Sequence, residues 1–163
     1  GNVLASRGSV IPFFNSLLNN GRKRLPLTHI DMTRFSISLE EGVKFVMDAT
    51  KNMYGGEIFV PKLFSFKILD LITAMAGNNN FEIIGIRPGE KLHETLISSD
   101  ESAFTYTYKN KYLILDILNN KVMNYYKSKG ASKVNNNFEY NSFSNKDYLG
   151  HKEFQKFLKK LKI

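Results

Sequence analysis

The stretch at residues 84–94, Ile-Gly-Ile-Arg-Pro-Gly-Glu-Lys-Leu-His-Glu, constrains the fold more than any other part of this chain. The apolar run at 81–86 predicts a strand, Pro88-Gly89 predicts a turn, and the charged residues behind them predict an exposed helical turn. Pro88 biases Arg87 towards an extended backbone and Gly89 allows a positive φ, so the guanidinium should project from a rigid corner. A planar, permanently charged group there suits a phosphate or diphosphate. From these residues alone, an ordinary solvated arginine before a turn is the alternative.

A second candidate anion site lies at Arg7-Gly8-Ser9, directly before a predicted helix. That helix is indicated by apolar residues at helical spacing, namely Val10, Phe13, Phe14, Leu17 and Leu18. The first amides of a helix lack intrahelical partners and the helix dipole is positive at this end, so an anion is favoured. A plain helix start with no ligand is the alternative.

The rest of the chain predicts alternating strands and helices. In chain order we expect an extended segment at 25–30, a helix from a Ser38 capping box to just before Gly55, a strand at 57–60, a helix capped by Ser65, a hairpin at 104–115, and helices at 119–129 and 151–163. Strands separated by helices indicate an α/β fold.

Composition narrows the function classes. With 163 residues, 42% of them hydrophobic, the chain can form its own core. The formal charge of +8 favours polyanions in general, but it is spread along the chain without a nucleic-acid motif, so we expect no nucleic-acid partner. There is no cysteine, no long apolar run and no signal-like segment, so we expect a soluble, cytoplasmic protein without a membrane span. The three histidines share no ligand spacing, and we expect no metal.

The 84–94 stretch belongs to a longer set of ordered motifs. They are Gly-Asn-Val-Leu-Ala-Ser-Arg-Gly-Ser-Val-Ile-Pro at 1–12, Met-Thr-Arg-Phe at 32–35, Gly-Gly-Glu-Ile-Phe-Val-Pro-Lys at 55–62 and Phe-Glu-Tyr-Asn-Ser-Phe-Ser-Asn-Lys-Asp-Tyr-Leu at 138–149. Together they resemble the nucleotide-sugar dehydratases and epimerases of bacterial polysaccharide biosynthesis, in the extended short-chain dehydrogenase/reductase superfamily. Within that group the chain is most similar to the inverting UDP-N-acetylglucosamine 4,6-dehydratases of the pseudaminic acid pathway.

The resemblance implies a fold class and a domain organisation. It implies α/β architecture in which residues 1–163 form a single substrate-binding, carboxy-terminal portion of a Rossmann-like enzyme. The strand at 57–60 and an accompanying helix would be the edge of an incomplete Rossmann domain, joining a parallel sheet. The amino-terminal NADP-binding Rossmann domain would be absent from this chain.

The resemblance also implies a site for UDP-N-acetylglucosamine or a similar UDP-sugar. It assigns to the nucleotide-sugar Asn2, Arg7, Gly8, Ser9, Thr28, Arg87, Tyr140, Asn145, Asp147 and Tyr148, and to the cofactor side Val3. The tail at 140–149 would fold over the substrate as a lid. Arg34 is interpreted as an ion-pair partner rather than a ligand contact. Loss of a charge-assisted Arg87–phosphate bond should cost about 2–3 kcal/mol, roughly 30- to 150-fold in affinity.

The family's reaction, as the resemblance implies it, is a lyase reaction that uses tightly held NADP. It oxidises carbon 4 of the sugar, eliminates water across carbons 5 and 6, and returns the hydride with inversion at carbon 5. The catalytic residues would precede Gly1, and the chain has no Gly-x-Gly-x-x-Gly motif. We therefore expect no bound cofactor and no activity of this chain alone. Tyr125 and Lys129 have the superfamily's Tyr-x-x-x-Lys spacing, but they lie beyond the substrate motifs and are interpreted as a chance match.

Three hypotheses about function follow. The first is the nucleotide-sugar-binding portion of a UDP-N-acetylglucosamine 4,6-dehydratase, completed by a missing amino-terminal half or by other copies of the chain. The second is the equivalent fragment of a UDP-sugar 4- or 5-epimerase. The third, from a different class, is a non-catalytic polyanion-binding or structural remnant.

Overall fold

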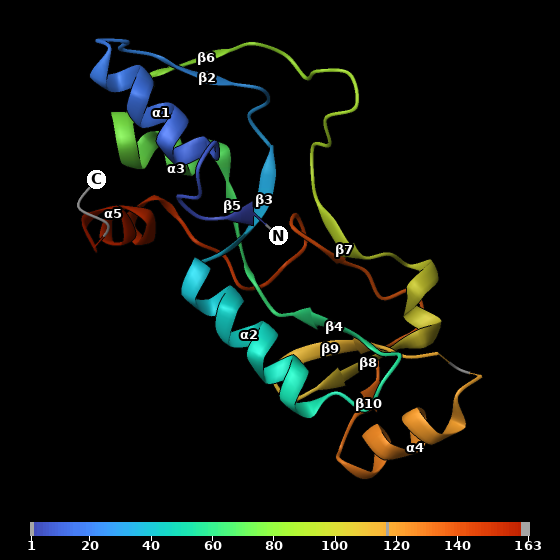
Figure 1. The fold of residues 1–163 in the computed structure, drawn as a ribbon. Coiled ribbons are helices and arrows are strands. Elements are labelled where there is room, and N and C mark those ends of the chain that lie inside the picture. Colours follow the sequence, from blue (N-terminus) through green and yellow to red (C-terminus); the bar gives the residue numbers. More distant parts are fainter. Residues whose placement is uncertain (1, 117, 161–163) are drawn as a thin grey trace. The chain divides into compact units, whose positions relative to one another are not determined.

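The computed structural model describes residues 2–116 and 118–160, and these form two compact units. Unit 1 comprises Gly1–Leu39, Leu63–Glu94 and Ser142–Ile163, and unit 2 comprises Glu40–Lys62 and Thr95–Asn141. The chain therefore passes from one unit to the other several times, as the colours of Figure 1 allow the reader to follow.

Unit 1 combines three helices with two small sheets. Its helices are α1 (Val10–Asn19), α3 (Ile68–Ala76) and α5 (His151–Lys160). One sheet has the order β1 (Asn2–Val3), β3 (Thr33–Ile37) and β5 (Phe64–Lys67), with β1 parallel and β5 antiparallel to β3. In the other, β2 (Leu25–Leu27) pairs in parallel with β6 (Phe81–Ile83). Figure 1 shows α1 and α3 beside this second pair.

The core of unit 1 forms where the apolar faces of its helices meet β2 and β5. Its fully buried members include Ile11 of α1 and Leu71 of α3. Helix α5 contributes Phe154, whose ring meets the edge of Phe66 at a centroid distance of 4.9 Å, while its described lysines are exposed. The helix predicted at 151–163 is thus confirmed for the residues that the structure describes, with its apolar side in the core.

Unit 2 is built on an antiparallel sheet. The order is β10 (Ser132–Lys133), β8 (Thr105–Tyr108), β9 (Lys111–Ile114) and β4 (Ile58–Pro61). Beside it stand α2 (Leu39–Asn52), which starts at the last residue of unit 1, the 3₁₀ helix η1 (Asp100–Phe104), α4 (Asn120–Ser128), and the pair β7 (Thr95–Ile97) and β11 (Tyr140–Asn141). The predicted hairpin is β8–β9, and its turn places Lys109 at a φ of 52°.

Two polar side chains are buried in unit 2 with specific partners. The Lys111 ammonium is paired with Asp48 and lies over the rings of Phe45 and Phe59, at 5.6 and 5.4 Å from their centroids. The Tyr126 hydroxyl donates to the Glu57 carboxylate, and burial raises the pKa of this phenol well above its ordinary value. Each buried polar group is thereby compensated by a hydrogen bond.

The outer side of α2 is apolar and exposed. The exposed residues are Leu39, Val43, Val46 and Met47, with 50–69% of their surface accessible, and no residue of α2 is buried. Of the residues that we expect to make apolar contacts, Val43, Val46 and Met47 are therefore exposed, whereas Phe45 is partly buried beside the Lys111 ammonium.

Three local predictions were wrong. Ser65 does not cap a helix: it lies in β5, and α3 begins at Ile68 after Lys67. The strand predicted for 81–86 ends at Ile83, because Gly85 has a φ of +84°, which lies outside the strand region. The strand at 57–60 corresponds to β4, whose partner within the described residues is the antiparallel β9, so this chain does not form a parallel sheet there.

The α/β class predicted from the sequence is confirmed, with mixed pairing in place of one parallel sheet. Among the described residues, no helix combines the length and the apolar character that a crossing of a bilayer requires.

Candidate functional site

Unit 1 contains an open pocket of about 900 Å³. Its wall brings together the start of the chain, the first turn of α1 and the loop that follows β6. The residues of interest that line it are Val3, Gly8, Ser9, Thr28, Arg34, Arg87 and Glu90. Ligand pockets in proteins commonly hold roughly 300–1,000 Å³, so this space can accept a molecule of nucleotide-sugar size.

The first turn of α1 gives one side of the pocket a positive electrostatic character. Ser9 is the N-cap residue, and its extended backbone (φ −78°, ψ 172°) directs the chain into the helix. The Ser9 hydroxyl oxygen is buried and has no hydrogen-bond partner among the described residues. The first turn contains no acidic residue, so no carboxylate of the helix offsets its amides and dipole. Pro12 suits this turn, because proline has no N–H and an N–H at this position would have no partner within the helix.

Arg87 occupies the first position of a hydrogen-bonded turn. The Glu90 amide donates to the Arg87 carbonyl at 3.0 Å, and Gly89 has a φ of +78°, which is the conformation of the third residue in a type II turn. The Arg87 amide donates to Glu90 Oε2 at 3.2 Å. Within the described part of the chain the Arg87 guanidinium makes no ion pair or hydrogen bond, and its side chain is exposed. The charge of Arg87 is therefore available to a ligand.

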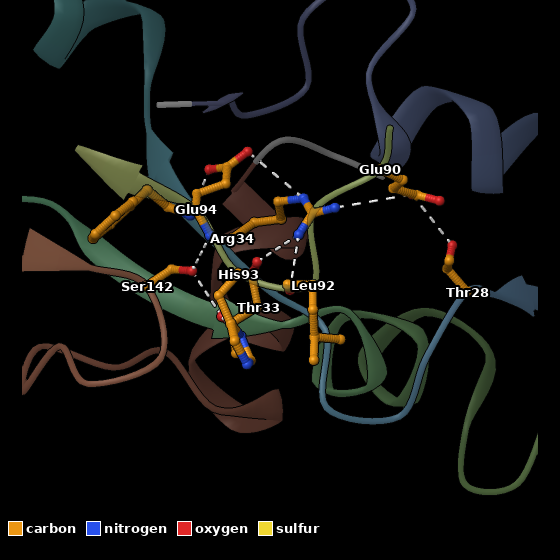
Figure 2. A network of polar contacts seen from close by, with 9 residues as sticks. Thr28, Thr33, Arg34, Glu90, Leu92, His93, Glu94 and Ser142 are labelled. Atoms are coloured by element: carbon orange, nitrogen blue, oxygen red, sulfur yellow. Dashed lines mark hydrogen bonds and ion pairs between the residues drawn. The ribbon is translucent and has the colours of Figure 1, made fainter. Parts of the chain in front are cut away.

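The half-buried guanidinium of Arg34, on β3, joins the 87–94 loop to the sheet (Figure 2). Its Nη1 donates to its neighbour's carbonyl, Thr33 O, at 2.7 Å and to Leu92 O at 3.2 Å. The same guanidinium lies 3.6 Å from Glu94 Oε1 and 3.9 Å from Glu90 Oε1. The predicted ion-pair role of Arg34 is confirmed, and two carboxylates share it.

A second polar network lies beside the first, around the Thr33 hydroxyl (Figure 2). This hydroxyl is 2.8 Å from His93 Nδ1 and 2.7 Å from Ser142 Oγ. The Glu94 amide donates to Ser142 Oγ at 2.9 Å, and the Ser142 amide donates to the Glu94 carbonyl at 2.8 Å. Burial lowers the pKa of His93, so the neutral imidazole is favoured, and its ring packs on Phe143 at 4.7 Å.

The structure brings only part of the predicted site together. Val3, Gly8, Ser9, Thr28 and Arg87 line the pocket, and the Thr28 hydroxyl also donates to Glu90 Oε1 at 3.4 Å. Arg7 is exposed and does not line the pocket, although its neighbours Ser6 and Gly8 do. Asn2 lies in β1, and its side chain falls outside the described residues.

The predicted tail residues are held by the protein itself. Asn145 Nδ2 donates to Leu63 O at 2.7 Å, to Ser65 Oγ at 2.9 Å and to Asp147 O at 3.0 Å. The Ser65 amide donates to Asp147 O, and Tyr148 forms a bridge with Ser65. Burial raises the pKa of Tyr148 to about 12.

None of these tail residues is among the described residues that line the pocket, and Tyr140 lies in β11 of unit 2. Their assignment to the substrate, and the lid role of the tail, stay predictions.

Sequence reasoning missed that Arg34 and Glu90 line the pocket. The signal was present, because Met-Thr-Arg-Phe and Arg-Pro-Gly-Glu were both recognised as motifs. What sequence could not supply is that β3 and the 87–94 loop are neighbours.

Tyr125 packs against Tyr54 at 4.9 Å and against Tyr126 at 5.1 Å, and the Lys129 ammonium lies over its ring, so its described contacts belong to the packing of unit 2.

The fold is shared with the X-ray structure of Pen from Bacillus thuringiensis, with a TM-score of 0.80 and 28% sequence identity over 99% of this chain and 47% of that chain. The model of the polysaccharide biosynthesis protein family matches residues 1–116. The chain belongs to this family, which confirms the family predicted from the motifs.

Two curated relatives give the comparison more detail. The chain is 50% identical over 159 residues to the UDP-N-acetylglucosamine 4,6-dehydratase (inverting) of Campylobacter jejuni, covering 94% of this chain and 47% of that protein. It is 41% identical over 118 residues to a UDP-glucose 4-epimerase of Rickettsia massiliae, covering 70% of this chain and 34% of that protein. The chain thus spans about half the length, or less, of these relatives.

Proposed function

We propose that this chain is the nucleotide-sugar-binding, carboxy-terminal portion of a UDP-N-acetylglucosamine 4,6-dehydratase, and that the pocket of unit 1 binds the diphosphate of the UDP-sugar. The observation that carries the proposal is that Arg87 and the first turn of α1 line the same pocket, and that this turn contains no acidic residue to offset the positive end of the helix dipole. A diphosphate between them would accept bonds from a guanidinium, from backbone amides and from the unpartnered Ser9 hydroxyl. Both relatives are named for UDP-sugar substrates, which supports a UDP-sugar as the ligand.

In this proposal the chain supplies binding and orientation. Contacts to the diphosphate hold the sugar in one position, and binding energy from this remote end orients the reacting carbons. Asn2, in β1, and Arg7, which precedes α1 and does not line the pocket in the described structure, are further proposed contacts. In this proposal, the groups that transfer the hydride and the proton lie in the part of a complete enzyme that this chain does not span, since the chain covers 47% of the relative.

We expect that the residues of this chain do not form an NADP site by themselves. The sequence has no Gly-x-Gly-x-x-Gly motif, and Val3 is the one residue that we assign to the cofactor side. NADP would supply hydride transfer in a complete enzyme.

Calorimetric titration of the 163-residue chain with UDP, UDP-N-acetylglucosamine and UDP-glucose tests the proposal. Saturable binding should weaken by roughly 30- to 150-fold in Arg87→Ala, because a charge-assisted bond to phosphate is lost. Arg87→Lys should weaken it less, since a point charge remains without the planar fork. Arg24→Ala is the matched control, because Arg24 is an exposed arginine of the same unit that does not line the pocket.

The three ligands also separate the alternatives. Tighter binding of UDP-glucose than of UDP-N-acetylglucosamine would favour the epimerase hypothesis, which the relative of 41% identity supports. Salt-sensitive binding to nucleic acid with no preference for UDP would contradict a nucleotide-sugar site and favour a polyanion-binding remnant.

A further inference from the structure

We propose that Arg34 is a positioning residue of the pocket: it holds the 87–94 loop against β3, and through Glu90 it fixes Arg87 for an anionic ligand. This inference rests on the proposed function and goes beyond it, because it assigns to the Met-Thr-Arg-Phe motif a task other than ligand contact. Figure 2 shows the arrangement, with the Arg34 guanidinium between the carboxylates of Glu90 and Glu94.

Arg34 and its neighbour Thr33 attach the 87–94 loop to β3. The loop's Leu92 carbonyl accepts from Arg34 Nη1 at 3.2 Å and from the Thr33 amide at 3.1 Å, so one carbonyl receives two donors from adjacent residues of β3. The Glu94 carboxylate adds the ion pair at 3.6 Å with Arg34 and accepts from the Phe35 amide at 3.3 Å. A planar guanidinium with several donors can serve a carbonyl and a carboxylate together, whereas an ammonium on a flexible stem cannot hold the same fixed geometry.

Glu90 links Arg34 to Arg87. Glu90 Oε1 faces Arg34 at 3.9 Å and accepts from Thr28 at 3.4 Å, while Glu90 Oε2 accepts from the Arg87 amide. Glu90 is therefore fixed on one side by Arg34 and Thr28, and on the other side it closes the turn that carries Arg87. The Arg34 side chain is 12% exposed, so water screens these contacts less than it screens a surface pair.

Arg34 also changes the balance of charge in the pocket. Glu90 lines the pocket, and an isolated carboxylate there would repel an anionic ligand. Arg34 lies next to this carboxylate and offsets it, while the described residues leave the Arg87 guanidinium without an ion-pair partner. One arginine thus compensates the loop's own acids, and the second stays available for the ligand.

The test compares Arg34→Lys, Glu90→Gln and Arg87→Ala in the 163-residue chain, with hydrogen exchange of the amides at 84–94 and UDP affinity as readouts. Arg34→Lys keeps the charge but not the fork, and Glu90→Gln is an isosteric change at a partly exposed side chain that should leave the fold intact. Both should speed exchange at 84–94 by about tenfold while α3 exchange stays unchanged. Arg87→Ala should weaken UDP binding with no change in loop exchange.

A double-mutant cycle decides how Arg34 acts. If it acts through Arg87, Arg34→Lys should weaken UDP binding about tenfold in the wild-type chain and by less than about twofold in the Arg87→Ala background. Fully additive losses would overturn the proposal, because they would mean that Arg34 contacts UDP directly. Unchanged loop exchange in both Arg34→Lys and Glu90→Gln would overturn it as well.

Failure of the proposed function gives a different result. If the folded wild-type chain does not bind UDP, the ligand assignment fails, whereas the exchange experiment still decides by itself whether Arg34 holds the loop.

Discussion

The hydroxyl oxygens of Thr33 and Ser142 lie 2.7 Å apart, although 109 positions separate the two residues in the sequence. Both side chains are buried, and the same Ser142 oxygen accepts from the Glu94 amide. One serine thus joins the tail of unit 1 to β3 and to the end of the 87–94 loop. This relationship explains why the tail is an integral part of unit 1 rather than an appendage.

Ser142→Ala should lower the free energy of unfolding by about 1–3 kcal/mol. The substitution leaves the Glu94 amide and the Thr33 hydroxyl with one partner fewer in a buried place, and unpaired buried polar groups are costly. Urea unfolding followed by circular dichroism measures the change. Ser16→Ala, at an exposed position of α1, is the control and should stay within about 0.5 kcal/mol of the wild type. Equal values for the two variants would show that the Ser142 network contributes no stability.

Asn145→Asp should destabilise unit 1 more than Asn145→Ala. The Asn145 amide nitrogen donates to three oxygen atoms, and an aspartate would place a charged acceptor against those same oxygens. Thermal unfolding of both variants tests the order. An Asn145→Asp protein of wild-type stability would contradict the bonds described for this residue and would leave its amide available to a ligand.

The stability of the chain should fall as the pH drops below about 6.5, and His93 should contribute to this fall. Burial lowers the pKa of His93 in the folded chain, so the unfolded chain binds this proton more readily. The contribution of His93 is therefore present above its ordinary pKa and is lost as the pH falls towards the lower value of the folded chain.

Urea unfolding at pH 7.5 and 5.5 should show a smaller pH effect in His93→Gln than in the wild type. A His93→Gln protein with an unchanged pH effect would disprove the assignment.

Gly89→Ala should cost about 1 kcal/mol of stability and loosen the Arg87 turn. No atom lies within 4 Å of the Cβ that alanine would add, so the cost comes from the positive φ of +78° and not from a clash. Gly89→Asn should cost less, because asparagine tolerates this conformation better than alanine does. Chemical denaturation measures both variants, and an alanine variant as stable as the wild type would mean that the turn adopts another conformation at no cost.

Val46→Gln should leave the free energy of unfolding within about 0.5 kcal/mol of the wild type, whereas Phe154→Ala should lower it by about 3–5 kcal/mol. Val46 on α2 is 63% exposed, and Phe154 on α5 is 0% exposed. Val46 and Phe154 each belong to a set of apolar residues at helical spacing, so the sequence alone does not show which of the two is buried. If Val46→Gln destabilised the chain by several kcal/mol, the apolar face of α2 would have to be covered.

The correct predictions are those that depend on neighbours in the sequence. The spacing of apolar residues located α1 and α5, and Pro88-Gly89 located the turn after Arg87. Strands were harder, because β3 and β5 are stabilised by each other and by the tail through hydrogen bonds between residues distant in sequence. Ser65 illustrates this: its type and position suit a helix cap, but its backbone is paired with Arg34's strand and with the tail.

The sequence by itself determined the family, the amphipathic helices, the rigid turn and the presence of cationic groups at 7 and 87, because motifs, periodicity and proline–glycine geometry are local properties. Only the tertiary structure decided which of these residues share a pocket. It placed Arg34 between Glu90 and Glu94. It also directed the Asn145 side-chain amide to hydrogen bonds with backbone oxygens of the protein. The partner of a polar side chain depends on which distant segments fold against it, and no local pattern encodes that choice.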